Sequence, residues 1–156
     1  MMTAVCELTW RLLPGMQARG RGYIVNVASV AALVPSSAGH TLYGASKSFL
    51  IRFSEALALE NADRGVKVCA LCPGFTYTEF HDVNGTREMI SKLPEYLWLD
   101  AKDVVAETIT SMAQGKARSV VIPGRQYKLI VFINRYLPWL AGFLTKRNAS
   151  HYRVTD

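Results

Sequence analysis

Residues 29–47, SVAALVPSSAGHTLYGASK, decide the fold of this chain. They follow a short apolar run, Tyr23–Ala28, and lead into a long helical pattern that begins near Tyr43. The stretch ends on Tyr43-Gly-Ala-Ser-Lys47, and residues four apart stand one above the other on a helix. We therefore expect a strand, a loop and a helix, with the phenol and the ammonium side by side on the helix.

The pair of Tyr43 and Lys47 suits proton transfer. A free phenol holds its proton too tightly for exchange at neutral pH. A lysine cation at about 4 Å, with an effective dielectric of about 20, stabilises the phenolate by roughly 4 kcal/mol. Ser29 lies where the strand should end, and its hydroxyl could hold a substrate oxygen while Tyr43 gives or takes the proton. The Tyr-x-x-x-Lys spacing alone is weak, because surface helices often carry it by chance.

Two further segments strengthen the signal. NVAS at 26–29, YGASK at 43–47 and CPGFTYT at 72–78 occur in this order, with strand and helix patterns between them. Together they resemble the short-chain dehydrogenase/reductase family, and the resemblance extends from residue 1 to about residue 125. It implies hydride transfer between NAD or NADP and a small-molecule carbonyl or alcohol, in a homo-oligomer formed through the helix at 43–62.

The resemblance also assigns roles to single residues. It implies catalysis by Ser29, Tyr43 and Lys47, with Tyr43 as general acid or base and Lys47 also bonded to the nicotinamide ribose. The residues that it places at the cofactor are Tyr43, Lys47, Pro73, Gly74, Thr76 and Thr78. No metal ligand is expected.

The pattern along the chain predicts an α/β fold. Tyr23–Ala28 is continuously apolar apart from Asn26, which is typical of a parallel strand covered on both faces. With right-handed crossovers, the carboxyl ends of parallel strands gather the site at one edge of the sheet. The remaining expected elements are helices at 3–16, 43–62 and 100–115 and strands at 66–72 and 119–122.

The glycine-rich loop that grips a dinucleotide is missing from this sequence. No G-x-x-x-G-x-G follows a strand, and Gly20-Arg-Gly22 precedes one. The family's catalytic asparagine would fall at or before Met1, and Asn26 is not its match. The fold class is therefore a partial Rossmann-like doubly wound parallel sheet, the back half of such an enzyme. One side of the strand before Ser29 should be unpaired and its apolar face partly uncovered. The choice between NAD and NADP stays open.

Two domains follow from this organisation. Residues 1–125 form the partial catalytic domain, with a substrate loop at about 75–99. Residues 126–156 form an apolar, basic, helical tail. The loop's aromatic residues either line a lipophilic pocket or hold the loop against the protein: Phe75, Tyr77, Phe80, Tyr96 and Trp98.

The net charge of +6 lies mostly in the tail, where six basic residues from Arg125 onward stand against Asp156 alone. No nucleic-acid-binding module accompanies this charge. The tail either packs on the protein, which we favour, or lies on a membrane as an interfacial helix. Cys69 and Cys72 fall in a strand pattern and are expected to be core cysteines, which suits a reducing cytoplasm.

Three functions remain open from the sequence. The first is an oxidoreductase whose sequence here is truncated. The second is a non-catalytic fragment that acts as an interaction partner. The third is a peripheral membrane protein that binds through its tail.

Overall fold

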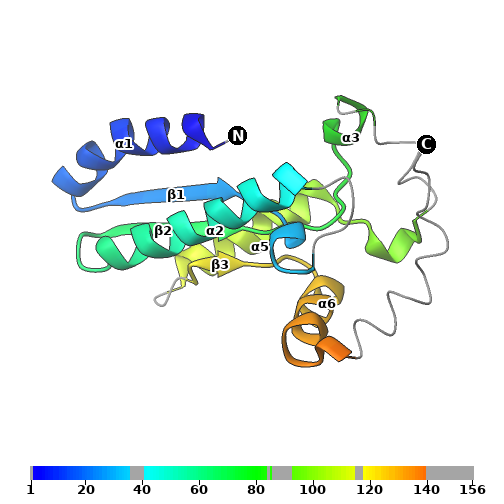
Figure 1. The fold of residues 1–156 in the computed structure, drawn as a ribbon. Coiled ribbons are helices and arrows are strands. Elements are labelled where there is room, and N and C mark those ends of the chain that lie inside the picture. Colours follow the sequence, from blue (N-terminus) through cyan, green and yellow to red (C-terminus); the bar gives the residue numbers. More distant parts are fainter. Residues whose placement is uncertain (1, 36–40, 84, 86–92, 115–117, 140–156) are drawn as a thin grey trace.

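The computed structural model describes residues 2–35, 41–83, 85, 93–114 and 118–139, in which helices and strands alternate (Figure 1). In chain order the elements are α1 (Thr3–Ala18), β1 (Gly22–Val27), the 3-10 turn η1 (Val30–Ala32), α2 (Thr41–Glu60), β2 (Val66–Leu71), α3 (Phe80–Val83), the 3-10 turn η2 (Glu95–Leu97), α5 (Ala101–Ala113), β3 (Val120–Val121) and α6 (Arg125–Tyr136).

The three strands form one parallel sheet in the order β1-β2-β3 within the described part of the chain. Val25 lies opposite Cys69, and Ala70 lies opposite Val120. Parallel neighbours need a crossover, and α2 and α5 supply the two crossovers. The predicted α/β class with a parallel sheet is confirmed. Two predicted features, the helix end at Gly115 and the tail from residue 140, lie outside the described residues.

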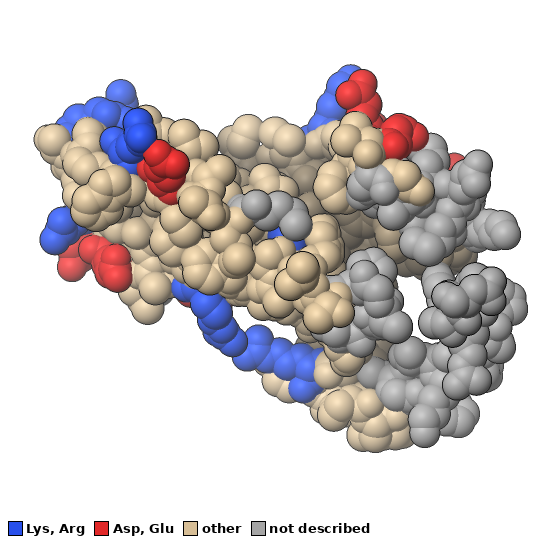
Figure 2. Space-filling model, turned by 45° about the horizontal axis from the view of Figure 1, so that its top comes forward, with Lys and Arg blue, Asp and Glu red and all other residues tan. Residues whose placement is uncertain are grey.

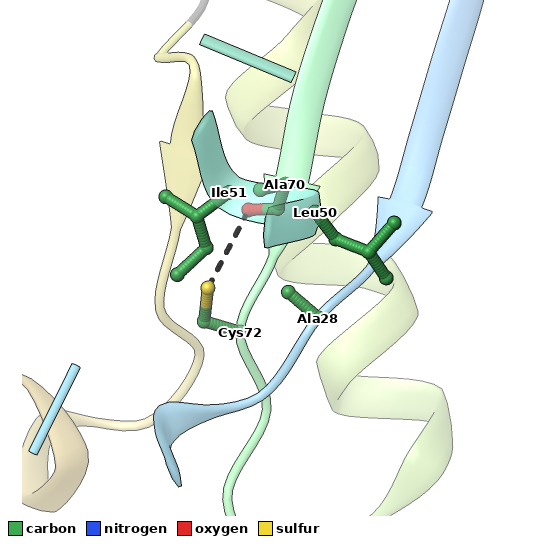
Figure 3. Packing of buried hydrophobic residues seen from close by; sticks show 5 residues of the cluster. All are labelled: Ala28, Leu50, Ile51, Ala70 and Cys72. Atoms are coloured by element: carbon green, nitrogen blue, oxygen red, sulfur yellow. Dashed lines mark hydrogen bonds between the residues drawn. The ribbon is translucent and has the colours of Figure 1, made fainter. Parts of the chain in front are cut away.

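The central strand β2 is buried on both faces. Ala70 and Cys72 pack with Ala28 of the β1 end against Leu50 and Ile51 of α2 (Figure 3). The alternate residues Cys69 and Leu71 face α5 and pack on Val104 and Met112. A strand between two helical layers is apolar on both faces, which is why residues 68–72 show no alternation; Lys67, near the start of the strand, is the polar exception and is only partly buried.

The two cysteines of β2 are core residues, as expected. Cys69 and Cys72 are both 0% exposed. Burial raises the pKa of Cys69 to about 11 and that of Cys72 to about 12. Both thiols therefore stay protonated and inert at neutral pH.

The first strand, β1, is covered on one face only. Tyr23, Val25 and Val27 are 56%, 41% and 53% exposed. The pattern of a strand covered on both faces is therefore not realised, and the partly uncovered face expected from the incomplete sheet is present, because α5 packs under β2 and β3 and not under β1. The expected unpaired side is confirmed, since β1 is an edge strand among the described residues.

Asn26, the polar residue of β1, has a structural role. Its side-chain amide donates to Ser54 Oγ at 2.9 Å, and Ser54 in turn donates to the Leu50 carbonyl at 2.7 Å. Asn26 and Ser54 are buried, so this chain of bonds satisfies polar groups that would otherwise be costly. It ties β1 to α2 just before the strand reaches Ser29.

Candidate functional site

A cavity of about 600 Å³ opens where β1 and β2 end and α2 begins. This is the carboxyl edge of the parallel sheet, where such folds bind ligands. All the site residues predicted from the sequence line the cavity: Ser29, Tyr43, Lys47, Pro73, Gly74, Thr76 and Thr78. They come from three separate segments, so the tertiary fold brings the predicted set together.

Tyr43 and Lys47 lie on the first turns of α2. Lys47 Nζ lies 5.7 Å from the centre of the Tyr43 ring, and it donates to the Val27 carbonyl at 2.8 Å. That carbonyl is at the end of β1, so the bond fixes the ammonium at the strand edge beside the phenol. Burial lowers the pKa of Lys47, and the nearby Cys72 acts weakly in the opposite direction. An ammonium with two protons left after bonding Val27 can still donate into the cavity.

Ser29 follows β1 directly and caps η1. Its Oγ accepts from the Ala31 N–H at 3.1 Å, which is an N-cap contact. This bond uses an acceptor lone pair of the hydroxyl and leaves its proton available. Capping is thus a structural role that Ser29 can hold while its O–H donates to a ligand in the cavity.

The segment after β2 forms the opposite wall. The Pro73 carbonyl accepts from the Val30 N–H at 3.1 Å, which joins this wall to the Ser29 turn. Thr76 Oγ1 donates to the Gly74 carbonyl at 3.0 Å, and Thr78 Oγ1 accepts from the Phe80 N–H at 3.3 Å at the start of α3. Both threonine hydroxyls therefore shape the loop as well as line the cavity.

Tyr127 of α6 also lines the cavity, and sequence analysis missed it. Its hydroxyl accepts from the Phe75 N–H at 2.9 Å and donates to the Leu97 carbonyl at 2.5 Å. The side chain is 5% exposed, and burial raises the pKa of Tyr127 although the bond from the Phe75 N–H opposes this. The phenol therefore stays neutral and joins the loop after β2 to the segment around η2.

The ring of Tyr127 explains why residue 74 is glycine. A Cβ built on Gly74 would lie 1.9 Å from Tyr127 Cζ, which no real contact allows. The backbone at Gly74 is thus pressed against a buried ring, and the cavity wall has its shape because of this contact. The contact joins residues 74 and 127, which are far apart in the chain, and no local sequence pattern indicates it.

The aromatic residues of the loop divide into two groups. Phe75 and Phe80 line the cavity, and the Phe80 ring lies 6.5 Å from that of Tyr43. Tyr77 instead stacks on Trp98 at 4.8 Å and 18°. The idea that all five aromatic residues line a pocket is therefore wrong, because Tyr77, Tyr96 and Trp98 are not among the lining residues. Stacking of Tyr77 on Trp98 holds the loop together from outside.

Replacing Tyr127 with phenylalanine tests its bridging role. The change keeps the ring against Gly74 but removes the hydrogen bonds that the Tyr127 hydroxyl makes to the Phe75 N–H and the Leu97 carbonyl. We expect the free energy of unfolding to fall by about 1–3 kcal/mol, measured by urea denaturation. Tyr136→Phe on the same helix is the control, since Tyr136 is 61% exposed and should change stability by less than about 0.5 kcal/mol. Equal midpoints for the two variants would contradict the bridge.

Comparison with known proteins points to one family. The family profile described as short chain dehydrogenase matches residues 1–88. The chain is 31% identical over 121 residues to the ketoacyl reductase HetN of Nostoc sp. (strain PCC 7120), which covers 78% of this chain and 40% of that protein. It is 44% identical over 82 residues to the uncharacterized oxidoreductase YbbO of Escherichia coli (strain K12), covering 52% of this chain and 30% of YbbO.

Solved structures agree with the sequence relatives. A short-chain dehydrogenase from Streptomyces avermitilis superposes with a TM-score of 0.70 at 26% identity, covering 96% of this chain and 58% of that one. A short-chain dehydrogenase from Sphingobium yanoikuyae in complex with NADPH gives a TM-score of 0.70 at 26% identity. The match covers 99% of this chain and 54% of that one. The chain thus spans a little over half of these two structures and less than half of the curated relatives.

Proposed function

The chain belongs to the short-chain dehydrogenase family, and from this premise we propose that it supplies the catalytic part of an NAD(P)-dependent oxidoreductase. The reaction is the interconversion of a carbonyl and an alcohol by hydride transfer. One observation carries the proposal: Ser29, Tyr43, Lys47 and the Pro73-Gly74 wall all line one cavity. The cap at Ser29 and the close approach at Gly74 also serve the packing, but packing alone does not require Tyr43 and Lys47 to face the same cavity.

The residues divide the work of proton transfer. During reduction Tyr43 gives its hydroxyl proton to the substrate oxygen, and during oxidation it takes the proton back. Lys47 stabilises the phenolate that remains, and Ser29 holds the oxygen with its free O–H. A nicotinamide cofactor held beside Lys47 and Pro73-Gly74 would supply or accept the hydride. These roles match the chemistry that a positioned acid and a nearby cation provide.

The residues present fit the nicotinamide end of a dinucleotide. The cavity has the size of small-molecule sites, and it combines apolar walls with the polar groups of Lys47, Thr76 and Thr78. A pyrophosphate would need a glycine-rich turn at a helix N-terminus, which this sequence does not contain. We propose NAD or NADP as the cofactor without choosing between them.

The substrate is proposed to be lipophilic. Aliphatic side chains from three elements, Val30, Val104 and Ile130, line the cavity beyond the catalytic residues. Each methylene buried against such a wall adds about 0.8 kcal/mol. The cavity therefore favours a carbonyl or alcohol that carries an apolar chain.

A series of ketones of increasing chain length tests this function. The enzyme for the assay is the full gene product, or a chimera in which the N-terminal half of the E. coli relative precedes these residues. Oxidation of NADH and of NADPH is followed by absorbance. We expect kcat/KM to rise about threefold to fourfold per added methylene until the cavity is full. A preference for short hydroxy acids would contradict the proposal of a lipophilic substrate. If no carbonyl compound were converted, the proposed activity itself would be wrong.

A homo-oligomer formed through residues 43–62 is part of the proposal. Along α2, Leu42 and Phe49 lie two turns apart on one face and are 83% and 41% exposed, so the described residues leave this apolar face largely uncovered. Phe49→Glu should reduce the mass found by sedimentation equilibrium, because a buried charge would have no partner. Ile109→Glu on α5 is the matched control, since Ile109 is 62% exposed outside α2. An unchanged mass for Phe49→Glu would exclude this interface.

We place the enzyme in the cytoplasm, where the three free thiols would stay reduced. Peripheral contact of the C-terminal segment with a membrane is the accompanying proposal. None of the described helices has the length and hydropathy that a membrane crossing requires.

A further inference from the structure

Helix α6 has one face on the protein and one face in solvent. Tyr127 and Val131 are 5% and 8% exposed and pack beside Val30. The outward face is also apolar, and its members recur at intervals of three and four residues. This outward face, called here the α6 stripe, consists of Leu129, Phe132 and Tyr136, which are 58%, 53% and 61% exposed, and the 73% exposed Trp139 follows after the helix has ended.

The stripe is continuous and rich in aromatic groups. The rings of Phe132 and Tyr136 lie 4.9 Å apart on adjacent turns. Trp139 follows just beyond the end of α6. Phenylalanine, tyrosine and tryptophan together are the composition found where proteins meet the headgroup region of a bilayer. The packed face shows that α6 is held by the domain, so the stripe is presented on a fixed support.

Cations border the stripe. Arg125 and Arg135 are exposed, and neither forms an ion pair with a carboxylate of the described residues. The Arg135 guanidinium lies 5.8 Å from the centre of the Tyr136 ring, at the edge of the stripe. Lys128 is different, because its ammonium is bonded to Glu107. Figure 2 shows basic side chains along the lower margin of the molecule, leading to the uncharged surface in the region of α6.

We infer that the α6 stripe docks on an anionic lipid surface. An apolar helical face with aromatic residues and basic borders is the pattern of interfacial helices. Two unpaired guanidiniums beside the stripe complement anionic headgroups, and from residue 125 onward the sequence holds six basic residues and only Asp156 as an acid. A protein partner of the same shape would have to supply the opposite charge around its rim, whereas a membrane containing anionic lipid supplies it everywhere.

Docking would bring the catalytic cavity next to the lipid. Ile130, the neighbour of Leu129 in α6, lines the cavity, as does Tyr127 one turn earlier. A lipophilic substrate dissolved in the bilayer would then have a short path to Tyr43. This second step rests on the proposed activity. The docking deepens the membrane contact proposed above and can be tested without turnover.

Cosedimentation with vesicles tests the docking. The full chain is mixed with vesicles of phosphatidylcholine alone or with added phosphatidylserine, at low and high salt. We expect binding to the anionic vesicles only, and weaker binding as salt rises. The triple variant Leu129→Gln, Phe132→Gln, Tyr136→Gln should lose at least about a hundredfold in affinity. The double variant Arg125→Gln, Arg135→Gln should lose about fivefold per cation.

Matched controls distinguish binding through the α6 stripe from non-specific hydrophobic binding to vesicles. Trp10→Gln with Ile109→Gln removes two apolar side chains that are 80% and 62% exposed elsewhere, and it should bind like the parent. Tyr43→Phe should also bind like the parent, because docking needs no turnover. Equal binding to neutral and anionic vesicles, or full binding by the stripe variant, would overturn the inference. So would a stripe variant that keeps its vesicle binding but loses an oligomer, since the stripe would then face a second copy.

Discussion

Tyr43→Phe is expected to lower kcat for carbonyl reduction by about 10²–10⁴-fold, because it removes the proton that the substrate oxygen must receive. The ring remains, so its contact with Phe80 at 6.5 Å should persist. The free energy of unfolding should therefore stay close to that of the parent. The measurement is steady-state kinetics on the full gene product or the chimera, together with urea denaturation of each variant.

A second tyrosine provides the control. Tyr77 is 52% exposed and stacks on Trp98 outside the cavity, so Tyr77→Phe should leave kcat nearly unchanged. Near-normal turnover by Tyr43→Phe would remove the phenol from the mechanism. If Tyr43→Phe lowered both kcat and the free energy of unfolding substantially, Tyr43 would instead be a residue needed for packing.

The second large effect concerns cofactor binding. We expect the 156-residue chain by itself to show no micromolar affinity for NADH or NADPH, a shortfall of several kcal/mol from the roughly −8 kcal/mol that such affinity requires. In the proposed function, Lys47 and Pro73-Gly74 would reach only the nicotinamide end of the ligand. The pyrophosphate normally rests on backbone N–H groups at a helix N-terminus, approached closely across glycines.

Calorimetric titration of the purified chain checks this expectation. The chimera that carries the N-terminal half of the E. coli relative is the positive control, and it should bind one of the two dinucleotides. Micromolar binding by the chain alone would mean that these residues contain a dinucleotide site with no glycine-rich loop. The proposal that these residues bind only the nicotinamide end, with the pyrophosphate bound by a separate glycine-rich segment, would then be wrong.

Local patterns in the sequence were enough for the long helices, the strands and the placement of Tyr43 and Lys47 together on α2. The apolar period of α2 and the spacing of Tyr43 and Lys47 act over a few residues, where the geometry of a helix leaves little choice. The helix expected from residue 100 is α5, and the Asp100 carboxylate caps it by accepting from the Lys102 N–H at 2.7 Å. Ser29 and Pro73-Gly74 were assigned through the family resemblance, and the cavity that gathers them agrees with a parallel sheet.

The tertiary structure decided which of several apolar surfaces are covered. Tyr127 bonds residues that lie 52 and 30 positions away, a relation that no periodicity records. Likewise, the pattern of β1 shows only that both of its faces are apolar, and the position of α5 decides that one is bare. The same holds for α6, whose two apolar faces look alike in sequence. A periodic pattern reports which side chains share a face, whereas burial depends on what the rest of the chain places against that face.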